Sequence, residues 1–400
     1  MSVPANSLPQ TLIRPVMPEL DSLRGIAILV VLFFHGFGIA NATNMPRPLR
    51  MFIIATMGGW SGVYLFFVLS GFLITGILLD SKAKPDYYRR FYIRRALRIL
   101  PAFYLLLLVL WIVPRTGILY GRQVGWRFLT LSFFYLANVT TIFGVPAQYT
   151  ALWSLAVEEH FYLAWPTAIR ALSRRAAAYC AAGIFVATPI IRAITFKSGH
   201  DAGAGYTWLV ADGLALGALI GILSRGPWGE RTRMRWISIA CFAAAIALFV
   251  VGAPFGIWRA SFFAGAMLRR TAVDLFYAGL LVATLLLGTS RLKWIVNRPV
   301  LRWFGEISYG LYLIHMLAFD FVDHCLVRYF PNTFLMIPSH FGLLCMRFLV
   351  AAALASGIAY LSRRYFEEPF LRLKDRWTAP KRPRAPVSVP AMTEAVERSA

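Results

Sequence analysis

The feature that most constrains this sequence is a series of ten apolar runs, each about 20 residues long, separated by short polar segments. A helix of about 20 residues spans the hydrocarbon core of a bilayer and satisfies all its backbone hydrogen bonds internally. Only 15% of the residues are charged, against roughly 25% in soluble domains. We therefore expect an all-α polytopic membrane protein, with transmembrane helices near residues 23–42, 59–79, 97–114, 152–171, 177–195, 206–224, 236–253, 271–289, 304–322 and 341–362.

The positive charges predict how these helices are oriented. The net charge is +23, but Lys and Arg lie in short clusters between the apolar runs, so we interpret them as topology determinants and expect no nucleic-acid partner. The most basic cluster, within 82–98, should be cytoplasmic. The later basic clusters fall on the same side only if a further apolar run, 126–144, does not cross the bilayer. We predict that this run is re-entrant or interfacial and that both termini are cytoplasmic.

The domain organisation follows from the same pattern. Residues 1–17 form a polar tail, residues 18–375 form one membrane domain, and residues 376–400 form a Pro-rich, basic tail that should be disordered in the cytoplasm. The four cysteines show no metal-ligand spacing, so we expect no metal site. Three glycines share one helix face and predict close helix packing: Gly213, Gly217 and Gly221.

Arg24 and His35 are the ionisable residues that stand out in the first apolar run. They are eleven residues apart, which places them on one helix face and about 16 Å apart along the axis. This geometry suits one long ligand with an anionic end at Arg24 and a reactive end near His35; the alternative is an interfacial anchor and a hydrogen-bonded core histidine. Asp21 is predicted to cap the helix, with an ion pair to Arg24 as the alternative.

Arginines and aromatic residues alternate in the segment 87–98. Planar guanidinium groups there could bind phosphates in a forked geometry, whereas a positive-inside anchor explains the same residues without a ligand. In the second span, the small pair Ser70–Gly71 allows either a ligand or another helix to approach closely.

Two adjacent carboxylates, Glu158 and Glu159, open the apolar run 152–171. Adjacent helical residues point about 100° apart, so we expect only one of them to face a site. Glu158 shares a helix stripe with Ser154 and Tyr162 and is the catalytic candidate, the alternative being a carboxylate favoured by the helix dipole.

The run 304–322 carries a further stripe of polar residues, Ser308, Tyr312 and His315, with His315 well inside the membrane. A histidine in such a place can be catalytic or can be a hydrogen-bonded core residue. Both interpretations remain open from the residues alone.

Together these segments resemble the motifs of the acyltransferase-3 family, membrane-embedded enzymes that transfer acyl groups, mostly acetyl from acetyl-CoA, to hydroxyls of sugars and related acceptors. The matching stretches are LDSLRG with the following His35, FFVLSGFLIT, the arginine segment, WSLAVEEHFYLAWP and GEISYGLYLIH. The resemblance implies a donor site made by Arg24, Arg94, Arg95, Arg98 and Ser70. It also implies catalytic roles for His35, Glu158 and His315.

One position departs from the family pattern. An arginine often stands two residues before the aspartate at 212, but here Val210 does, so we expect no Arg–Asp pair at this place.

The resemblance implies an O-acetyltransferase of the bacterial inner membrane that takes acetyl-CoA from the cytoplasm. A neutral imidazole, with an unperturbed pKa of about 6.5, could make His35 the base for the acceptor hydroxyl, and whether His35 also carries the acetyl group covalently is left open. The acceptor should be a sugar hydroxyl of a cell-surface polysaccharide or its lipid-linked precursor. Alternatives are a small metabolite such as a macrolide and, from another class, a polysaccharide-precursor transporter or flippase.

Overall fold

The structure, a computed structural model, describes residues 12–14, 16–116, 124–201, 203–288 and 290–378. Over these residues it contains helices and no strand, so the predicted all-α class is confirmed. The α-helices are α1 (Pro18–Phe37), α2 (Arg47–Met57), α3 (Gly62–Ser81), α4 (Tyr87–Ile112), α5 (Trp126–Phe133), α6 (Leu152–Ala171), α7 (Arg174–Lys197), α8 (Thr207–Val210), α9 (Asp212–Leu223), α10 (Arg231–Gly252), α11 (Phe263–Gly288), α12 (Lys293–Val296), α13 (Pro299–Tyr329), α14 (Pro331–Met336), α15 (Phe341–Leu361) and α16 (Glu368–Thr378). A π-helix, Ser362–Glu367, joins α15 to α16.

Each of the ten predicted spans overlaps one of these helices or, for 206–224, the pair α8 and α9, and the first span ends at Phe37 rather than at residue 42. Eight helical stretches of the described chain are long and apolar enough to cross a bilayer. The other two predicted spans are α6, which carries Glu158 and Glu159, and the pair α8 and α9, of which α9 has 12 residues and a length of about 18 Å. The chain is a multi-pass membrane protein, and the number of ten crossings stays a prediction.

The segment 126–144 contains only short helices. The longer one, α5, has 8 residues and a length of about 12 Å, too short to cross a bilayer.

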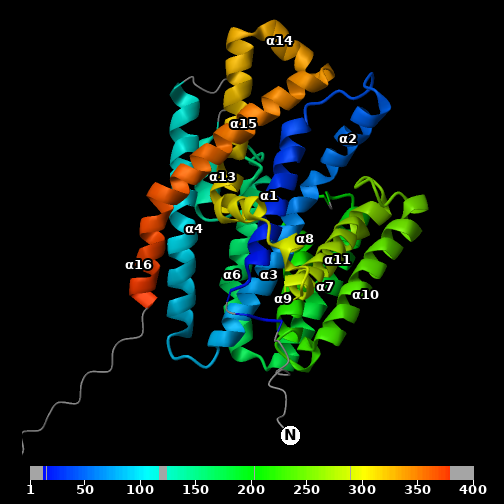
Figure 1. The fold of residues 1–400 in the computed structure, drawn as a ribbon, viewed down its shortest axis with the longest axis vertical. Coiled ribbons are helices and arrows are strands. Elements are labelled where there is room, and N and C mark those ends of the chain that lie inside the picture. The colour runs from blue at the N-terminus through cyan, green and yellow to red at the C-terminus, as the bar shows by residue number, and fades with distance from the viewer. Residues whose placement is uncertain (1–11, 15, 117–123, 202, 289, 379–400) are drawn as a thin grey trace, which may run out of the picture.

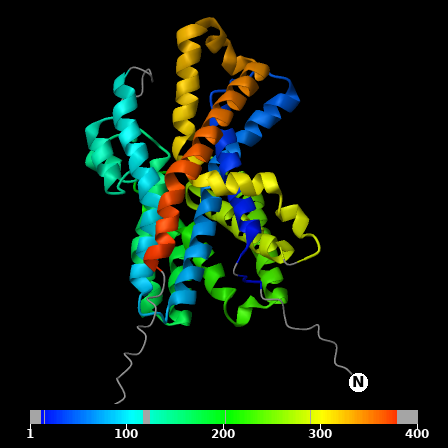
Figure 2. The same ribbon diagram turned by 60° about the vertical axis from the view of Figure 1, so that its left-hand side comes forward.

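Figure 1 shows the start of α1 and the end of α16 both in the lower half of the molecule, and Figure 2 shows α2 rising above the bundle beside the upper parts of α13 and α15. The assignment of the lower end to the cytoplasm stays a prediction. Helix α16 extends to Thr378, past the predicted boundary of the tail, and residues 379–400 lie outside the described residues.

Helices α1 and α13 are parallel and touch through their backbones. A Cβ atom at Gly25 would lie 1.9 Å from the carbonyl oxygen of Leu301, and one at Gly305 would lie 1.9 Å from the carbonyl oxygen of Asp21. Both glycines are therefore needed for this contact, in the way small residues allow close packing in membranes. Gly25 therefore lies opposite Gly305, 280 positions later, and the same offset relates His35 to His315.

The predicted packing role of the glycine stripe is confirmed where α9 crosses α3. A Cβ atom at Gly217 would lie 2.1 Å from the carbonyl oxygen of Val68, and one at Gly71 would lie 2.0 Å from the carbonyl oxygen of Leu214. Gly71, the second residue of the Ser70–Gly71 pair, therefore packs against α9. The side chain of Ser70 points away from α9.

Asp21 does not cap α1. The helix begins at Pro18, a residue suited to the first helical position, so Asp21 lies inside the first turn. Asp21 instead forms the alternative ion pair with Arg24, whose Nη1 lies 3.3 Å from Asp21 Oδ1.

The backbone contact of α1 and α13 yields a test of the fold. Gly25→Ala should lower the free energy of unfolding by about 1–3 kcal/mol, because the new methyl group forces the two helices apart. The matched control is Gly357→Ala on α15, where a Cβ atom meets nothing within 4 Å. The measurement is unfolding in an SDS titration, and equal midpoints for the two variants would contradict the close packing.

Candidate active site

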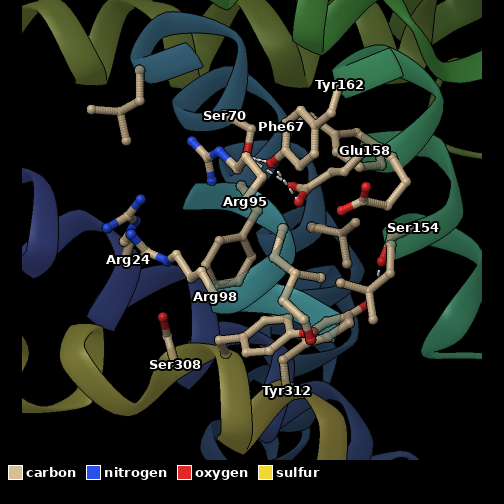
Figure 3. Close-up of a pocket in the computed structure, with 17 residues that line it drawn as sticks. Arg24, Phe67, Ser70, Arg95, Arg98, Ser154, Glu158, Tyr162, Ser308 and Tyr312 are labelled. Carbon is tan, nitrogen blue, oxygen red and sulfur yellow. Dashed lines mark hydrogen bonds between the residues drawn. The ribbon is translucent and has the colours of Figure 1, made fainter. Parts of the chain in front are cut away.

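The five motif segments surround one cavity, which we name the inner cavity. It is lined from α1, α3, α4, α6 and α13 and holds about 810 Å³ of empty space, part of it open to solvent. Figure 3 labels the lining residues Arg24, Phe67, Ser70, Arg95, Arg98, Ser154, Glu158, Tyr162, Ser308 and Tyr312.

Glu158 is held in this cavity by two hydrogen bonds. Ser70 Oγ donates to Oε1 at 2.9 Å, and the Tyr162 hydroxyl donates to Oε2 at 3.0 Å (Figure 3). The predicted stripe is confirmed, because Ser154, Glu158 and Tyr162 all line the cavity. The carboxylate has a fixed orientation and remaining acceptor capacity, so it can accept a hydrogen bond or a proton from a hydroxyl group.

Three arginines face the inner cavity from α1 and α4. Arg24 pairs with Asp21, whereas Arg95 and Arg98 make no ion pair or hydrogen bond within the described part of the chain. Arg95 instead lies over the ring of Tyr162, 5.0 Å from its centroid. Arg95 is half-buried and Arg98 is exposed, so both guanidinium groups are accessible to a ligand in the cavity. The cavity is thus electrostatically suited to an anionic ligand.

A second cavity, which we name the outer cavity, adjoins the first between the end of α3 and the start of α4. It holds about 1090 Å³ of empty space, part of it open to solvent. Its basic lining residues are Lys84, Arg90, Arg94, Arg95 and Arg98, of which Arg95 and Arg98 also line the inner cavity. Arg94 therefore lies in the outer cavity alone. The lining carboxylate, Asp80, is bound by Arg225 at 2.9 and 3.1 Å.

His35 and His315 lie side by side between α1 and α13, with ring centroids 4.8 Å apart. Nδ1 of His35 lies 3.0 Å from the carbonyl oxygen of Val31, and Nδ1 of His315 lies 2.8 Å from that of Tyr312. These contacts assign the proton of each ring to Nδ1 and leave Nε2 as an acceptor. His315 is fully buried, and its Nε2 has no partner among the described residues.

The expected single cleft from Arg24 to His35 is not what the structure shows. Arg24 lines the inner cavity, but neither histidine does. Tyr312 lines the cavity and its ring lies 5.6 Å from that of His315, with its hydroxyl 2.6 Å from Ser154 Oγ. The histidine pair therefore lies behind Tyr312, and the helix periodicity that aligned Arg24 with His35 could not reveal this side chain from another helix.

The expectation that only one of the two adjacent carboxylates faces the site is also wrong. Glu159 lines the inner cavity next to Glu158, because the cavity wraps around the side of α6. Glu159 also borders a further cavity between α4 and α6, together with Tyr135 and Leu163. The next residue, His160, contacts the Thr207 hydroxyl at 2.7 Å.

An Arg–Asp pair exists at Asp212, contrary to expectation. Arg192 of α7 donates to both carboxylate oxygens, at 3.1 and 2.8 Å, and the Thr271 hydroxyl donates to Oδ2 at 2.8 Å. Both Arg192 and Asp212 are fully buried. The sequence held a signal for this pair, since Arg192 is a charge inside an apolar run and needs a partner.

The chain matches the family model described as an acyltransferase domain over residues 17–356. It belongs to the acyltransferase-3 family. The family motifs of this acyltransferase-3 protein are the segments that line the inner cavity and carry the histidine pair. Among the described residues, no three His, Cys, Asp or Glu side chains lie close enough to hold a metal ion.

Several curated relatives are named O-acetyltransferases. The peptidoglycan O-acetyltransferase OatA of Listeria monocytogenes is 26% identical over 382 residues, covering 89% of this chain and 56% of the relative. The putative peptidoglycan O-acetyltransferase YrhL of Bacillus subtilis is 29% identical over 327 residues, covering 75% of this chain and 48% of the relative. The acyltransferase-3 chain thus spans about half the length of these curated relatives. No solved structure matches it.

The pair of Arg192 and Asp212 yields a stability prediction. Arg192→Met should cost about 3–5 kcal/mol of unfolding free energy, because it leaves the Asp212 carboxylate buried without its cation. The control is Arg233→Met, which removes an exposed ion pair with Glu230 and should cost no more than about 0.5 kcal/mol. The unfolding free energies of the two variants are compared in an SDS titration. A similarly small decrease in both variants would contradict the burial of the pair.

Proposed function

We propose that this chain is a membrane-embedded O-acetyltransferase that moves an acetyl group from acetyl-CoA to a hydroxyl of a cell-surface glycan. The observation that carries the proposal is a pair of arginines at the junction of two cavities, Arg95 and Arg98, which form no ion pair within the described residues. Its support also includes the family membership and the relatives named O-acetyltransferases.

The charge distribution suits coenzyme A in one orientation. Coenzyme A has phosphates at one end and its thiol at the other. The outer cavity, with Arg94 and its neighbours, would hold the phosphates, and planar guanidinium groups bind phosphate oxygens in a forked geometry. The acyl end would then reach the inner cavity, past Arg24 and Ser70 toward Tyr312. The donor would enter from the lower end of Figure 1, which we assign to the cytoplasm.

The histidine pair supplies a base for the acceptor. Nε2 of His35 would take the proton of the attacking hydroxyl as its oxygen forms a bond to the acetyl carbonyl carbon. The carbon–sulfur bond then breaks, and the proton passes to the departing thiolate, so the products are an acetyl ester and free CoA. Tyr312 lies where the thioester would meet the histidines, since its ring borders both the cavity and His315.

Glu158 and His315 would orient the reacting groups. The carboxylate of Glu158 is fixed by Ser70 and Tyr162, so it presents a defined acceptor to a hydroxyl entering the cavity. Nε2 of His315, which has no partner among the described residues, would accept a hydrogen bond from the acceptor or from protonated His35. Together with His35 they form the proposed catalytic set.

The relatives' names make peptidoglycan the first acceptor to test, in the plasma membrane of a bacterium. The test uses purified protein in liposomes with acetyl-CoA and either peptidoglycan fragments or a macrolide. We expect free CoA to be released in step with acetyl ester on the glycan. Ester on the macrolide alone would assign the protein to small metabolites, and movement of glycan precursor without CoA release would favour a transporter.

A first prediction concerns the base. His35→Ala should lower kcat about 100- to 10,000-fold while the protein still folds and inserts, because the hydroxyl loses its proton acceptor. The measurement is CoA release under saturating donor. The control is His200→Ala, a histidine exposed on the chain after α7, which should keep wild-type activity. Wild-type activity in His35→Ala would remove His35 from the mechanism.

A second prediction concerns the donor. Arg98→Lys keeps the charge but loses the planar fork, so KM for acetyl-CoA should rise about tenfold, the equivalent of about 1.4 kcal/mol of binding. Arg24→Lys should also raise KM for acetyl-CoA. Arg233→Lys at an exposed ion pair is the control. An unchanged KM in both cavity variants would reassign these arginines as membrane anchors.

A further inference from the structure

Arg347 is a buried arginine that none of the motifs contains. It lies on α15, inside a stretch apolar enough to span a membrane, and its side chain is 3% exposed. It does not line either cavity. We propose that Arg347 is a positioning residue for the proposed reaction: it fixes the end of α1 that carries His35 against the α13 helix that carries His315.

The guanidinium of Arg347 connects these two helices directly. Nη1 donates to the carbonyl oxygen of Gly36, the residue after His35, at 2.7 Å. Nε and Nη2 donate to the two carboxylate oxygens of Asp323 on α13, at 2.5 and 2.7 Å. One side chain therefore joins α1 and α13 on the side of the histidine pair away from Arg24.

The last turn of α1 depends on this contact. Ala40 N–H donates to the carbonyl oxygen of Phe37, so it is not available to Gly36 four residues before it. The Gly36 carbonyl is instead satisfied by Arg347, as basic side chains do at helix C-termini. A Cβ atom at Gly36 would lie 2.3 Å from the ring of Phe348, so α15 packs closely against this turn.

The histidine pair lies between two fixed points. On one side, Gly25 and Gly305 hold α1 and α13 in backbone contact, each ten residues before its histidine. On the other side, Arg347 joins Gly36 to Asp323. Without the contacts of Arg347, only side-chain packing would fix the distance of 4.8 Å between the centroids of the two histidine rings. Proton transfer needs this geometry, because a shift of about 1 Å can cost about 100-fold in rate.

Arg347 is held too precisely to be explained as a lone charge at an interface. Its guanidinium also lies over the ring of Phe319, 5.1 Å from the centroid, and Phe319 is four residues after His315 on the same face of α13. A lysine could keep the charge but could not hold Gly36 and both oxygens of Asp323 in one plane.

The test separates positioning from stability. Arg347→Met with Asp323→Leu removes both charges and replaces them with apolar side chains, so the double variant should fold as well as the native protein. It still lacks the bond to Gly36. We expect kcat for acetyl transfer to fall about 10- to 100-fold with KM for acetyl-CoA unchanged, because the donor cavities are untouched. Arg347→Lys should lie between the double variant and the native protein.

A second measurement does not depend on activity. Carbethoxylation of His35 by diethyl pyrocarbonate, followed by mass spectrometry, should be several-fold faster in the folded double variant, because the end of α1 is released. Arg233→Lys is the control for both measurements. Native kcat and native His35 labelling in the double variant would overturn the positioning role. Absence of acetyl transfer by the native protein would instead count against the proposed function, and the labelling result would still decide the role of Arg347.

Discussion

The parallel contact between α1 and α13 is the constraint on which the rest of the site depends. Two glycines let the backbones touch, and the matched spacing from each glycine to its histidine brings His35 and His315 to the same level. An imidazole inside a bilayer needs a partner, and each helix supplies one to its own histidine, the carbonyl oxygen of Val31 to His35 and that of Tyr312 to His315. The pairing of the helices brings the two rings together.

The charges in the cavities are stabilised differently from those in the rest of the bundle. Away from the cavities, Arg192 and Arg347 are buried and paired with aspartates. At the cavities, Arg95 and Arg98 face the open space and form no ion pair with a carboxylate of the described residues, although Glu158 and Glu159 line the same inner cavity. This contrast separates arginines that hold helices together from arginines that are available to a ligand, and it supports the assignment of the donor site.

Much of the fold follows from the sequence because a bilayer imposes a simple rule on helix length. Each of the ten apolar runs overlaps a helix, and the stripe of Ser154, Glu158 and Tyr162 follows from helix periodicity. Periodicity relates residues within one helix, so it could not predict that Ser70 binds Glu158, that Tyr312 separates the cavity from the histidines, or that Arg192 pairs with Asp212. The cap assigned to Asp21 failed because Pro18 starts the helix one turn earlier.

The most direct test of the central claim is a structure of the protein bound to a non-hydrolysable acetyl-CoA analogue in a lipid nanodisc. We predict phosphates against Arg94, Arg95 and Arg98 in the outer cavity, with the acyl end in the inner cavity beside Tyr312 and the histidine pair. An analogue bound elsewhere, or bound with its acyl end turned away from Tyr312, would contradict the account.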